Sequence, residues 1–182
     1  MDADVPYAER PEIDRWALAL LHQTVTNVTL ALESYDAKDA GSTIESFVDQ
    51  LSNWYVRRNR RRFWKSESDE DKLAAYNTLY TCLNTFIRLL APFTPFVAEE
   101  IYQNLVRSVD QDAPESIHLT DFPVADSELI DTDLSKAMRL AMNVASLGRA
   151  ARQKAAVRVR QPLAKMNIKV KDKSDFIIMN KP

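Results

Sequence analysis

The sequence predicts an all-α protein, a helical bundle that is followed by a small C-terminal β-hairpin. Glycine occurs only twice in 182 residues, against a usual share of about 7%, so tight turns and sheets are scarce. Apolar residues recur at steps of three and four over most of the chain, which is the period of an amphipathic helix. Near the C-terminus the period changes to two, as in a strand. With 46% hydrophobic residues, the chain can bury a core of its own.

The first two helices are predicted from single apolar stripes. Residues 12–35 carry one stripe, which includes Leu21 and Val28, so they form a helix of about six turns. A break is expected near residues 36–41. The stripe then resumes at Ile44 and continues into a run of arginines, which predicts a second helix without interruption as far as residue 65.

The third helix is expected over residues 69–91 and carries two apolar stripes, so it packs neighbours on both sides and lies at the centre of the bundle. Thr94 and Pro95 predict the start of a fourth helix that runs to about residue 109, with Thr94 as its N-cap. Its inward side chains are expected to be Val97, Ile101 and Leu105.

The C-terminal third predicts a crossing segment, a helix and a hairpin. Residues 110–130 are expected to be extended, and residues 132–154 form a fifth helix with a face of small side chains. A hairpin is expected around residues 161–165. We therefore predict a bundle domain over residues 1–155 and the start of a small α/β junction unit over residues 156–182. Because that tail is too short to close a domain, we expect the chain to belong to a longer protein.

The most informative chemical feature is the Arg segment, residues 57–65, in which six of nine side chains are cationic and none is acidic. Guanidinium groups match phosphate oxygens with a planar fork and stack on bases, so arginines beside tryptophans suit RNA. The helical spacing places several of them on one face. The alternative is a merely solvated helix face. The candidate RNA-binding side chains here are Trp54, Arg57, Arg58, Arg60, Arg61, Arg62, Trp64 and Lys65.

Charge is segregated along the rest of the chain. The net charge of −2 and pI near 5.8 argue against a general polyanion binder, so any nucleic-acid binding depends on patches. Residues 108–135 hold eight acids and no Lys or Arg, whereas residues 136–171 hold ten cations and no acid. We predict that this second basic segment lies on the same side as the Arg segment. Its candidate RNA-binding residues are Arg149, Arg152, Arg158 and Arg160.

Few residues suit catalysis or metal binding, and we predict neither a catalytic residue nor a metal site. The single cysteine, Cys82, lies in an apolar helical pattern and is expected to be a buried thiol. The two histidines, His22 and His118, are far apart in the sequence and are expected to be structural. Without an apolar run long enough to cross a membrane or a secretion signal at the start, a cytoplasmic protein is expected.

Three ordered motifs, at residues 53–64, 89–102 and 157–163, resemble the tRNA anticodon-binding region of the class I synthetases for isoleucine, valine and leucine. The similarity covers residues 12–170, and the isoleucyl family is the closest. It implies a helical bundle that docks the anticodon stem-loop of a tRNA, an isoleucine acceptor first of all, through the arginines of residues 57–62. It also implies partner domains in the same parent chain, one catalytic and one C-terminal.

The resemblance further implies that ATP and Mg²⁺ are used by the catalytic domain of the parent enzyme, a ligase, and that this part needs no cofactor. A phosphate-binding signature after a first strand, which an ATP site of that family needs, is missing. Three alternatives stay open: the same domain of a valyl or leucyl synthetase, a helical module that binds other proteins, and an independent enzyme. The last is the weakest, because no nucleophile-base pair or phosphate-cradling glycine loop is visible.

Overall fold

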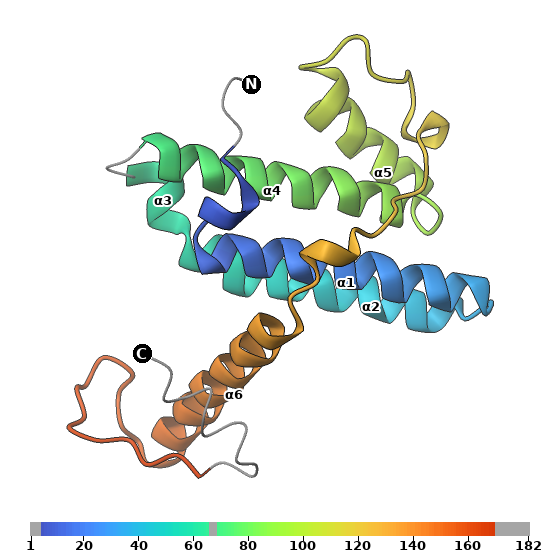
Figure 1. Cartoon of the computed structure of the whole chain (residues 1–182). Coiled ribbons are helices and arrows are strands. Elements are labelled where there is room, and N and C mark those ends of the chain that lie inside the picture. Colours follow the sequence, from blue (N-terminus) through green and yellow to red (C-terminus); the bar gives the residue numbers. More distant parts are fainter. Residues whose placement is uncertain (1–4, 66–68, 170–182) are drawn as a thin grey trace. The chain divides into compact units, whose positions relative to one another are not determined.

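The computed structural model describes residues 5–65 and 69–169, which are helical or irregular, with no strand among them (Figure 1). The all-α prediction is confirmed. The chain divides into two compact units, Met1–Asp131 and Thr132–Pro182, and the second unit begins with the final helix. The bundle domain over residues 1–155 and the junction unit over residues 156–182 stay predictions. Each unit is described by itself.

The first unit opens with an antiparallel pair of helices. Helix α1, Glu12–Glu33, and helix α2, Ala37–Gln50, pack along each other (Figure 1). Tyr35 makes the tight turn between them with a φ of 59°. The Asp36 carboxylate accepts a 2.9 Å hydrogen bond from the Asp39 N–H and caps α2. Because this cap starts the helix early, the expected break is shorter than predicted, and Gly41 lies inside α2.

The helix that follows is interrupted, so the prediction of one continuous helix as far as residue 65 is wrong. A π-helical segment, Leu51–Val56, continues α2, and the helical geometry breaks at Asn59 before helix α3, Arg60–Lys65. The π geometry inserts extra residues per turn, which changes the directions of the side chains that follow.

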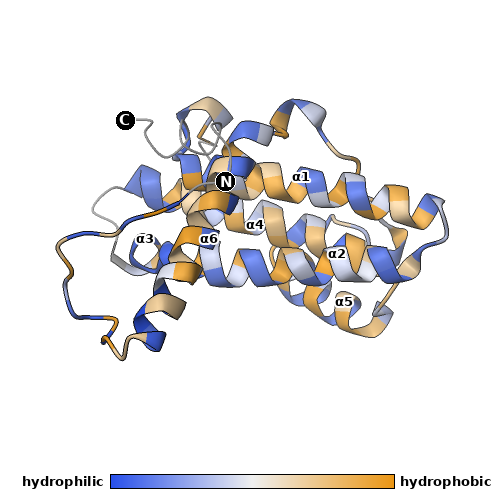
Figure 2. Cartoon of the chain, turned by 90° about the horizontal axis from the view of Figure 1, so that it is seen from below, coloured by the Kyte–Doolittle hydropathy of each residue, from blue (hydrophilic) through white to orange (hydrophobic). Residues whose placement is uncertain are grey.

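Helix α4, Asp69–Leu90, occupies the centre of the unit and packs against α1, α2, α3 and α5, as predicted. Figure 2 shows both hydrophobic and hydrophilic residues on each of these helices. One part of the core joins α1, α2 and α4 through Val25, Val28, Ile44 and Leu89. A second part joins the end of α4 to the next helix through Ile87, Ala98, Tyr102 and Ile117.

Helix α5, Pro95–Tyr102, continues as a π-helical segment, Gln103–Arg107, and its buried stripe differs from the predicted one. Val97 is 54% exposed, so its expected inward orientation is wrong. Ala98, Tyr102 and Val106 are buried instead, one position further along. Thr94 holds the N-cap position, but its side chain makes no capping hydrogen bond.

The crossing segment over residues 110–130 is irregular with two short 3₁₀ turns, Ile117–Leu119 and Ser127–Leu129. Glu99 anchors it by accepting from Ser116 Oγ at 2.7 Å and from the Ile117 N–H at 3.0 Å. Burial opposes the charge of Glu99, but these bonds and one from Gln103 outweigh it and lower the pKa of the carboxyl. His22 of α1 accepts the Asp126 N–H on Nδ1 at 3.1 Å.

The second unit is built on helix α6, Thr132–Lys154, at the position predicted. The residues after it return along the helix, and a Cβ on Gly148 would lie 3.6 Å from Met166 Sδ, an ordinary contact. The predicted hairpin is wrong for the described residues. Arg152 Nη1 donates to the carbonyls of Arg158 and Gln161, and this side chain holds the loop in an irregular path. Residues 170 and 171 of that hairpin lie outside the described residues.

Candidate nucleic-acid interface

The Arg segment presents four guanidinium-bearing residues to solvent. Arg57 and Arg58 precede the break at Asn59, whereas Arg60 and Arg61 lie in the first turn of α3, and all four are exposed. Despite the interruption of the helix, the predicted exposure of this face is therefore retained. The sequence of the first unit holds twelve Lys and Arg, and six of them fall within residues 57–65.

An exposed aromatic ring lies among these arginines. Trp64 is 72% exposed, and the Arg60 guanidinium carbon lies 5.4 Å from the centre of its ring. This is the distance of a cation-π contact, which orients the guanidinium and leaves much of the indole open. Trp54 is half-buried, and the side chain of Lys65 lies outside the described residues. Trp64 is thus the aromatic side chain of this segment best placed to stack on a base.

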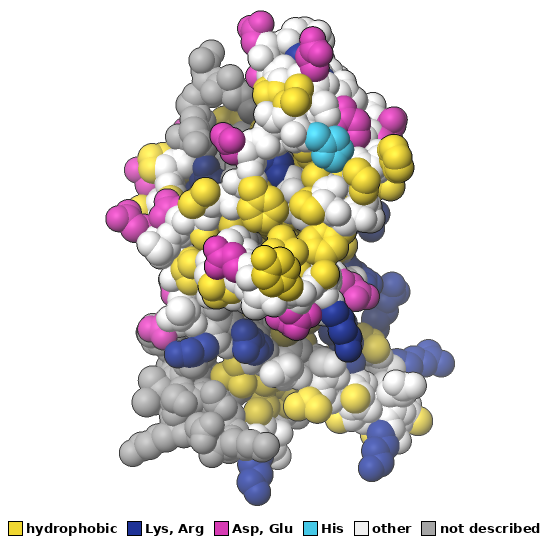
Figure 3. All heavy atoms as spheres, turned by 90° about the vertical axis from the view of Figure 1, so that its right-hand side faces the viewer, with side chains coloured by type: hydrophobic (Ala, Val, Ile, Leu, Met, Phe, Trp, Pro, Cys, Tyr) yellow, Lys and Arg dark blue, Asp and Glu magenta, His cyan; other side chains and the backbone are white. Residues whose placement is uncertain are grey.

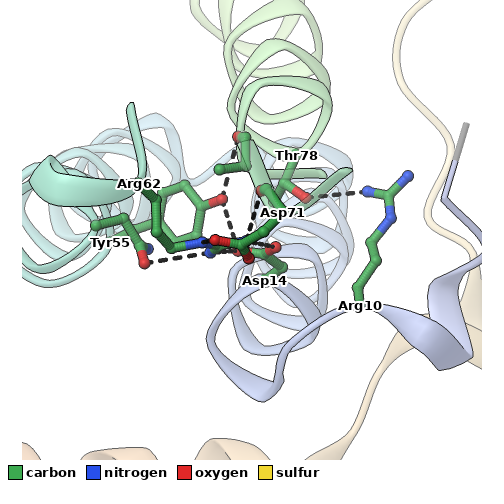
Figure 4. Close-up of polar contacts among 8 residues, drawn as sticks. Arg10, Asp14, Tyr55, Arg62, Asp71 and Thr78 are labelled. Atoms are coloured by element: carbon green, nitrogen blue, oxygen red, sulfur yellow. Dashed lines mark hydrogen bonds and ion pairs between the residues drawn. The ribbon is translucent and has the colours of Figure 1, made fainter. Parts of the chain in front are cut away.

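Arg62 differs from its neighbours because it points into the protein, as Figure 4 shows. Its Nη1 donates to Asp14 Oδ1 at 2.7 Å, and its Nη2 donates to Asp14 Oδ2 at 2.8 Å. The guanidinium also reaches Asp71, with Nε donating to Oδ2 at 3.0 Å and Nη2 lying 2.7 Å from Oδ1. The Asp14 side chain is fully buried, and that of Arg62 is 16% exposed. Arg62 therefore joins α3 to α1 and α4.

Further polar groups complete this buried Arg62 clamp, the name used below for Asp14, Tyr55, Asn59, Arg62 and Asp71. The Tyr55 hydroxyl donates to Asp14 Oδ1 at 2.8 Å, and Asn59 Oδ1 accepts from Arg62 Nη1 at 3.2 Å. Burial, then the charge of Asp14, raises the pKa of Tyr55. Burial opposes the charge of Arg62, but hydrogen bonds and attraction from the two aspartates outweigh it and raise the pKa of Arg62 above its ordinary value.

Aromatic packing fixes the same segment from its apolar side. Phe63 is buried, and its ring meets Tyr55 edge-on with centroids 6.3 Å apart. It also meets Tyr76 of α4 edge-on at 5.3 Å. Tyr55, Asn59, Arg62 and Phe63 thus form the inward face, and the four arginines at positions 57, 58, 60 and 61 are exposed. The four exposed arginines are therefore held on a backbone whose other side is anchored in the core.

The second basic segment lies in the second unit. Arg158 and Arg160 are exposed, whereas Arg152 is half-buried and uses Nη1 for the two loop carbonyls. Arg149 is exposed, and its Nε donates to the Ala145 carbonyl at 3.3 Å. The composite site predicted from this segment and the Arg segment spans the two units and stays a prediction.

Sequence reasoning missed the Arg62 clamp, although two signals pointed to it. The apolar stripe of the second helix, extended from Tyr55 by steps of four and three, falls on Asn59 and Arg62 rather than on solvent-facing positions. Extending the stripe of α1 backward from Leu21 likewise leads to Asp14. A carboxylate on a buried stripe needs a cationic partner, and Arg62 supplies it.

Charge differs sharply between the units. Residues 1–131 hold twelve Lys and Arg against 23 acids, whereas residues 132–182 hold twelve against three. The first unit is therefore acidic in net charge, and its densest run of cations is the Arg segment, where a polyanion is attracted most strongly. The acidic surroundings also confine its RNA-binding surface to a few side chains.

Other chemistry is sparse in the part of the chain that the structure describes. Cys82 is fully buried, as predicted, and burial raises the pKa of its thiol to about 12. No group of three or more His, Cys, Asp or Glu side chains placed to hold a metal ion occurs among residues 5–65 and 69–169. Within the same residues, no helix has both the length and the apolar character needed to cross a membrane.

Comparison with known proteins identifies the class of protein to which this helical chain belongs. Residues 14–168 match the family described as the anticodon-binding domain of tRNA ligase, and the chain belongs to this family. The resemblance inferred from the three motifs is thereby confirmed.

Three similar relatives are each named isoleucine–tRNA ligase. The protein of Dehalococcoides mccartyi strain 195 is 64% identical over 88% of this chain, that of Thermus thermophilus 52% over 87%, and that of Clostridium novyi 48% over 90%. The matched part is 16%, 15% and 16% of these relatives, respectively. The chain thus spans about one sixth of the length of the curated relatives it matches.

Proposed function

We propose that this chain is the part of an isoleucine–tRNA ligase that binds the anticodon stem-loop of its tRNA. The observation that carries the proposal is the row of four exposed arginines, Arg57, Arg58, Arg60 and Arg61, on an otherwise acidic unit. An acidic protein that binds RNA needs such a local patch, because its overall field repels a polyanion. Membership of the anticodon-binding family supports the same function.

The chemistry of binding follows from the side chains present. Guanidinium forks bind phosphate oxygens in pairs of hydrogen bonds and position the RNA backbone without reading its sequence. The bases of an unpaired loop are unstacked, so one of them can stack on the exposed Trp64 ring. The Arg62 clamp keeps these groups on a rigid surface, which lowers the entropy lost on binding. Selection of the correct tRNA would then take place at this surface, before the reaction in the catalytic domain of the parent enzyme begins.

Catalysis is assigned to the rest of the parent enzyme. We infer that the ligation of isoleucine to tRNA uses ATP and Mg²⁺ in another domain of that enzyme, and that this chain holds no cofactor. The names of the relatives support isoleucine rather than valine or leucine as the amino acid. We propose the cytoplasm as the location of this role, since tRNA is charged there.

A tRNA panel tests the proposal. Fluorescence anisotropy would measure the binding of the purified chain to labelled transcripts that accept isoleucine, valine and leucine. We expect the tightest binding for the isoleucine acceptor. Preference for a valine or leucine acceptor would replace the specific assignment, and absence of binding to every transcript at low salt would overturn the function itself.

A further inference from the structure

Helices α2 and α4 leave an open apolar groove between them on the first unit. Its volume is about 610 Å³, and Val48 of α2 lines one side while Phe86, Leu90 and Phe93 line the other. Val48 is 40% exposed. These side chains extend the buried core at Ile44 out to solvent. Exposing apolar surface of this kind to water costs free energy, and contact with another apolar surface lowers the free energy.

Further apolar side chains are exposed on the first unit. Figure 3 shows hydrophobic side chains gathered over the side of the molecule where the α1–α2 and α4–α5 turns lie, with acidic side chains among them. The turn residue Tyr35 is 95% exposed, and Phe96 in the first turn of α5 is 89% exposed. Two aromatic side chains this open have no packing role within the first unit.

Gly41 gives an independent indication that something approaches this groove. It lies inside α2 and lines the groove, although glycine destabilises a helix interior relative to alanine. Apart from its two chain neighbours and the adjacent backbone of α2, no described atom lies within 4 Å of the position that a Cβ would take. The packing of the described residues therefore does not require glycine there, and the bare backbone of α2 is open to close approach by a partner.

The charges at the groove select the kind of partner. Glu45 and Asp49 line it, and none of its lining residues is Lys or Arg. A phosphate backbone is repelled by such a rim, so RNA is disfavoured. A protein segment with apolar side chains flanked by Lys or Arg complements both the apolar side chains of the groove and its two carboxylates. The matched part is 16% of the first relative, so most of a parent enzyme of that length lies outside this chain and is the source we consider for such a segment.

We propose that the α2–α4 groove docks a basic, apolar segment of another domain of the same parent ligase. The docked segment covers Val48 and Phe93 and packs on the backbone of Gly41, with its cations against Glu45 and Asp49. This contact fixes the Arg segment relative to the rest of the enzyme. It rests on the proposed function only in placing the chain within a ligase, and it holds whether or not the arginines bind tRNA.

Cysteine labelling in the absence of RNA tests the docking. Val48→Cys places a thiol in the groove, and Ser46→Cys places one on the same helix at an exposed residue outside the groove. Labelling by N-ethylmaleimide, followed by mass spectrometry of the peptide that contains each thiol, is compared between the 182-residue chain and the full-length ligase. We expect the Val48→Cys thiol to react at least about tenfold more slowly in the ligase, and the Ser46→Cys thiol to react equally in both.

Gly41→Ala separates docking from folding. In the 182-residue chain it should raise the melting temperature by roughly 1–4 °C, because alanine is the better helix former and the Cβ meets nothing. In the full-length ligase, Gly41→Ala combined with Val48→Cys should restore much of the labelling, because the added methyl group fills the space of the partner. Equal labelling of Val48→Cys in chain and ligase would overturn the proposal. Slowing of this thiol in the chain by added tRNA would overturn it in favour of RNA.

Discussion

Replacing Arg62 with alanine should destabilise the protein far more than replacing any of the exposed arginines. The change leaves the fully buried Asp14 carboxylate with the Tyr55 hydroxyl as its remaining clamp partner, and it removes the cation held by Asp71. Breaking a buried ion pair from one side costs about 3–5 kcal/mol, whereas a change at an exposed side chain costs within about 0.5 kcal/mol. Arg57→Ala is the matched control, since it removes the same side chain from solvent.

The assay is thermal and urea unfolding followed by circular dichroism. At about 2–4 °C per kcal/mol for a chain of this length, Arg62→Ala should lower the melting temperature by roughly 6–20 °C, and Arg57→Ala by about 2 °C or less. Asp14→Ala should cost less in the Arg62→Ala background than in the wild type, with a coupling above about 1 kcal/mol. Equal midpoints for the two arginine variants would refute the assignment of Arg62 to the core.

Three further predictions concern pH, the second basic segment and the thiol. Burial lowers the pKa of His22, so the folded protein binds fewer protons than the unfolded chain, and its stability should fall as the pH drops below about 6.5 toward the lowered value. His22→Gln should make the urea midpoint less dependent on pH between pH 7 and 5.5. If His118→Gln, at an exposed histidine, has the same effect, the assignment of this pH dependence to His22 is wrong. Deleting residues 157–182 should weaken tRNA binding without altering the unfolding of residues 12–109, and full-strength binding would leave the Arg segment as the sole site. Cys82 should resist a thiol reagent in the folded chain and react once in urea, and a fast folded-state reaction would contradict its burial.

The regular helices were predictable because their signals are local. The periodicity placed α1, α4 and α6 within a few residues, and the two stripes of α4 correctly indicated a central helix. The failures occurred where distant groups decide the outcome. The hairpin failed because Arg152 holds the carbonyls of the following loop, which alternating residues do not reveal. Val97 was misplaced because the neighbours of α5 select the adjacent stripe for burial.

The candidate site was predictable in composition and only partly in geometry. The number and spacing of the arginines indicated an RNA-binding face, and Arg57, Arg58, Arg60 and Arg61 are exposed as that face requires. Arg62 could not be separated from them by charge alone, because its role depends on Asp14, 48 residues away in the sequence. The interruption lies at Asn59, whose side-chain oxygen accepts from Arg62 Nη1, and the apolar periodicity alone did not indicate it.

The central claim is that the exposed arginines bind tRNA through phosphate contacts, and the salt dependence of binding tests it most directly. Affinity for the isoleucine-accepting transcript would be measured at several salt concentrations for the wild-type chain and for the Arg57→Ala, Arg60→Ala, Arg61→Ala triple variant. Each phosphate contact contributes about −0.9 to the slope of log affinity against log salt in a duplex and about −0.7 in a single strand. We predict weaker binding, a slope reduced by about 2–3, and an unchanged melting temperature. An unchanged affinity and slope would show that this face is only solvated surface.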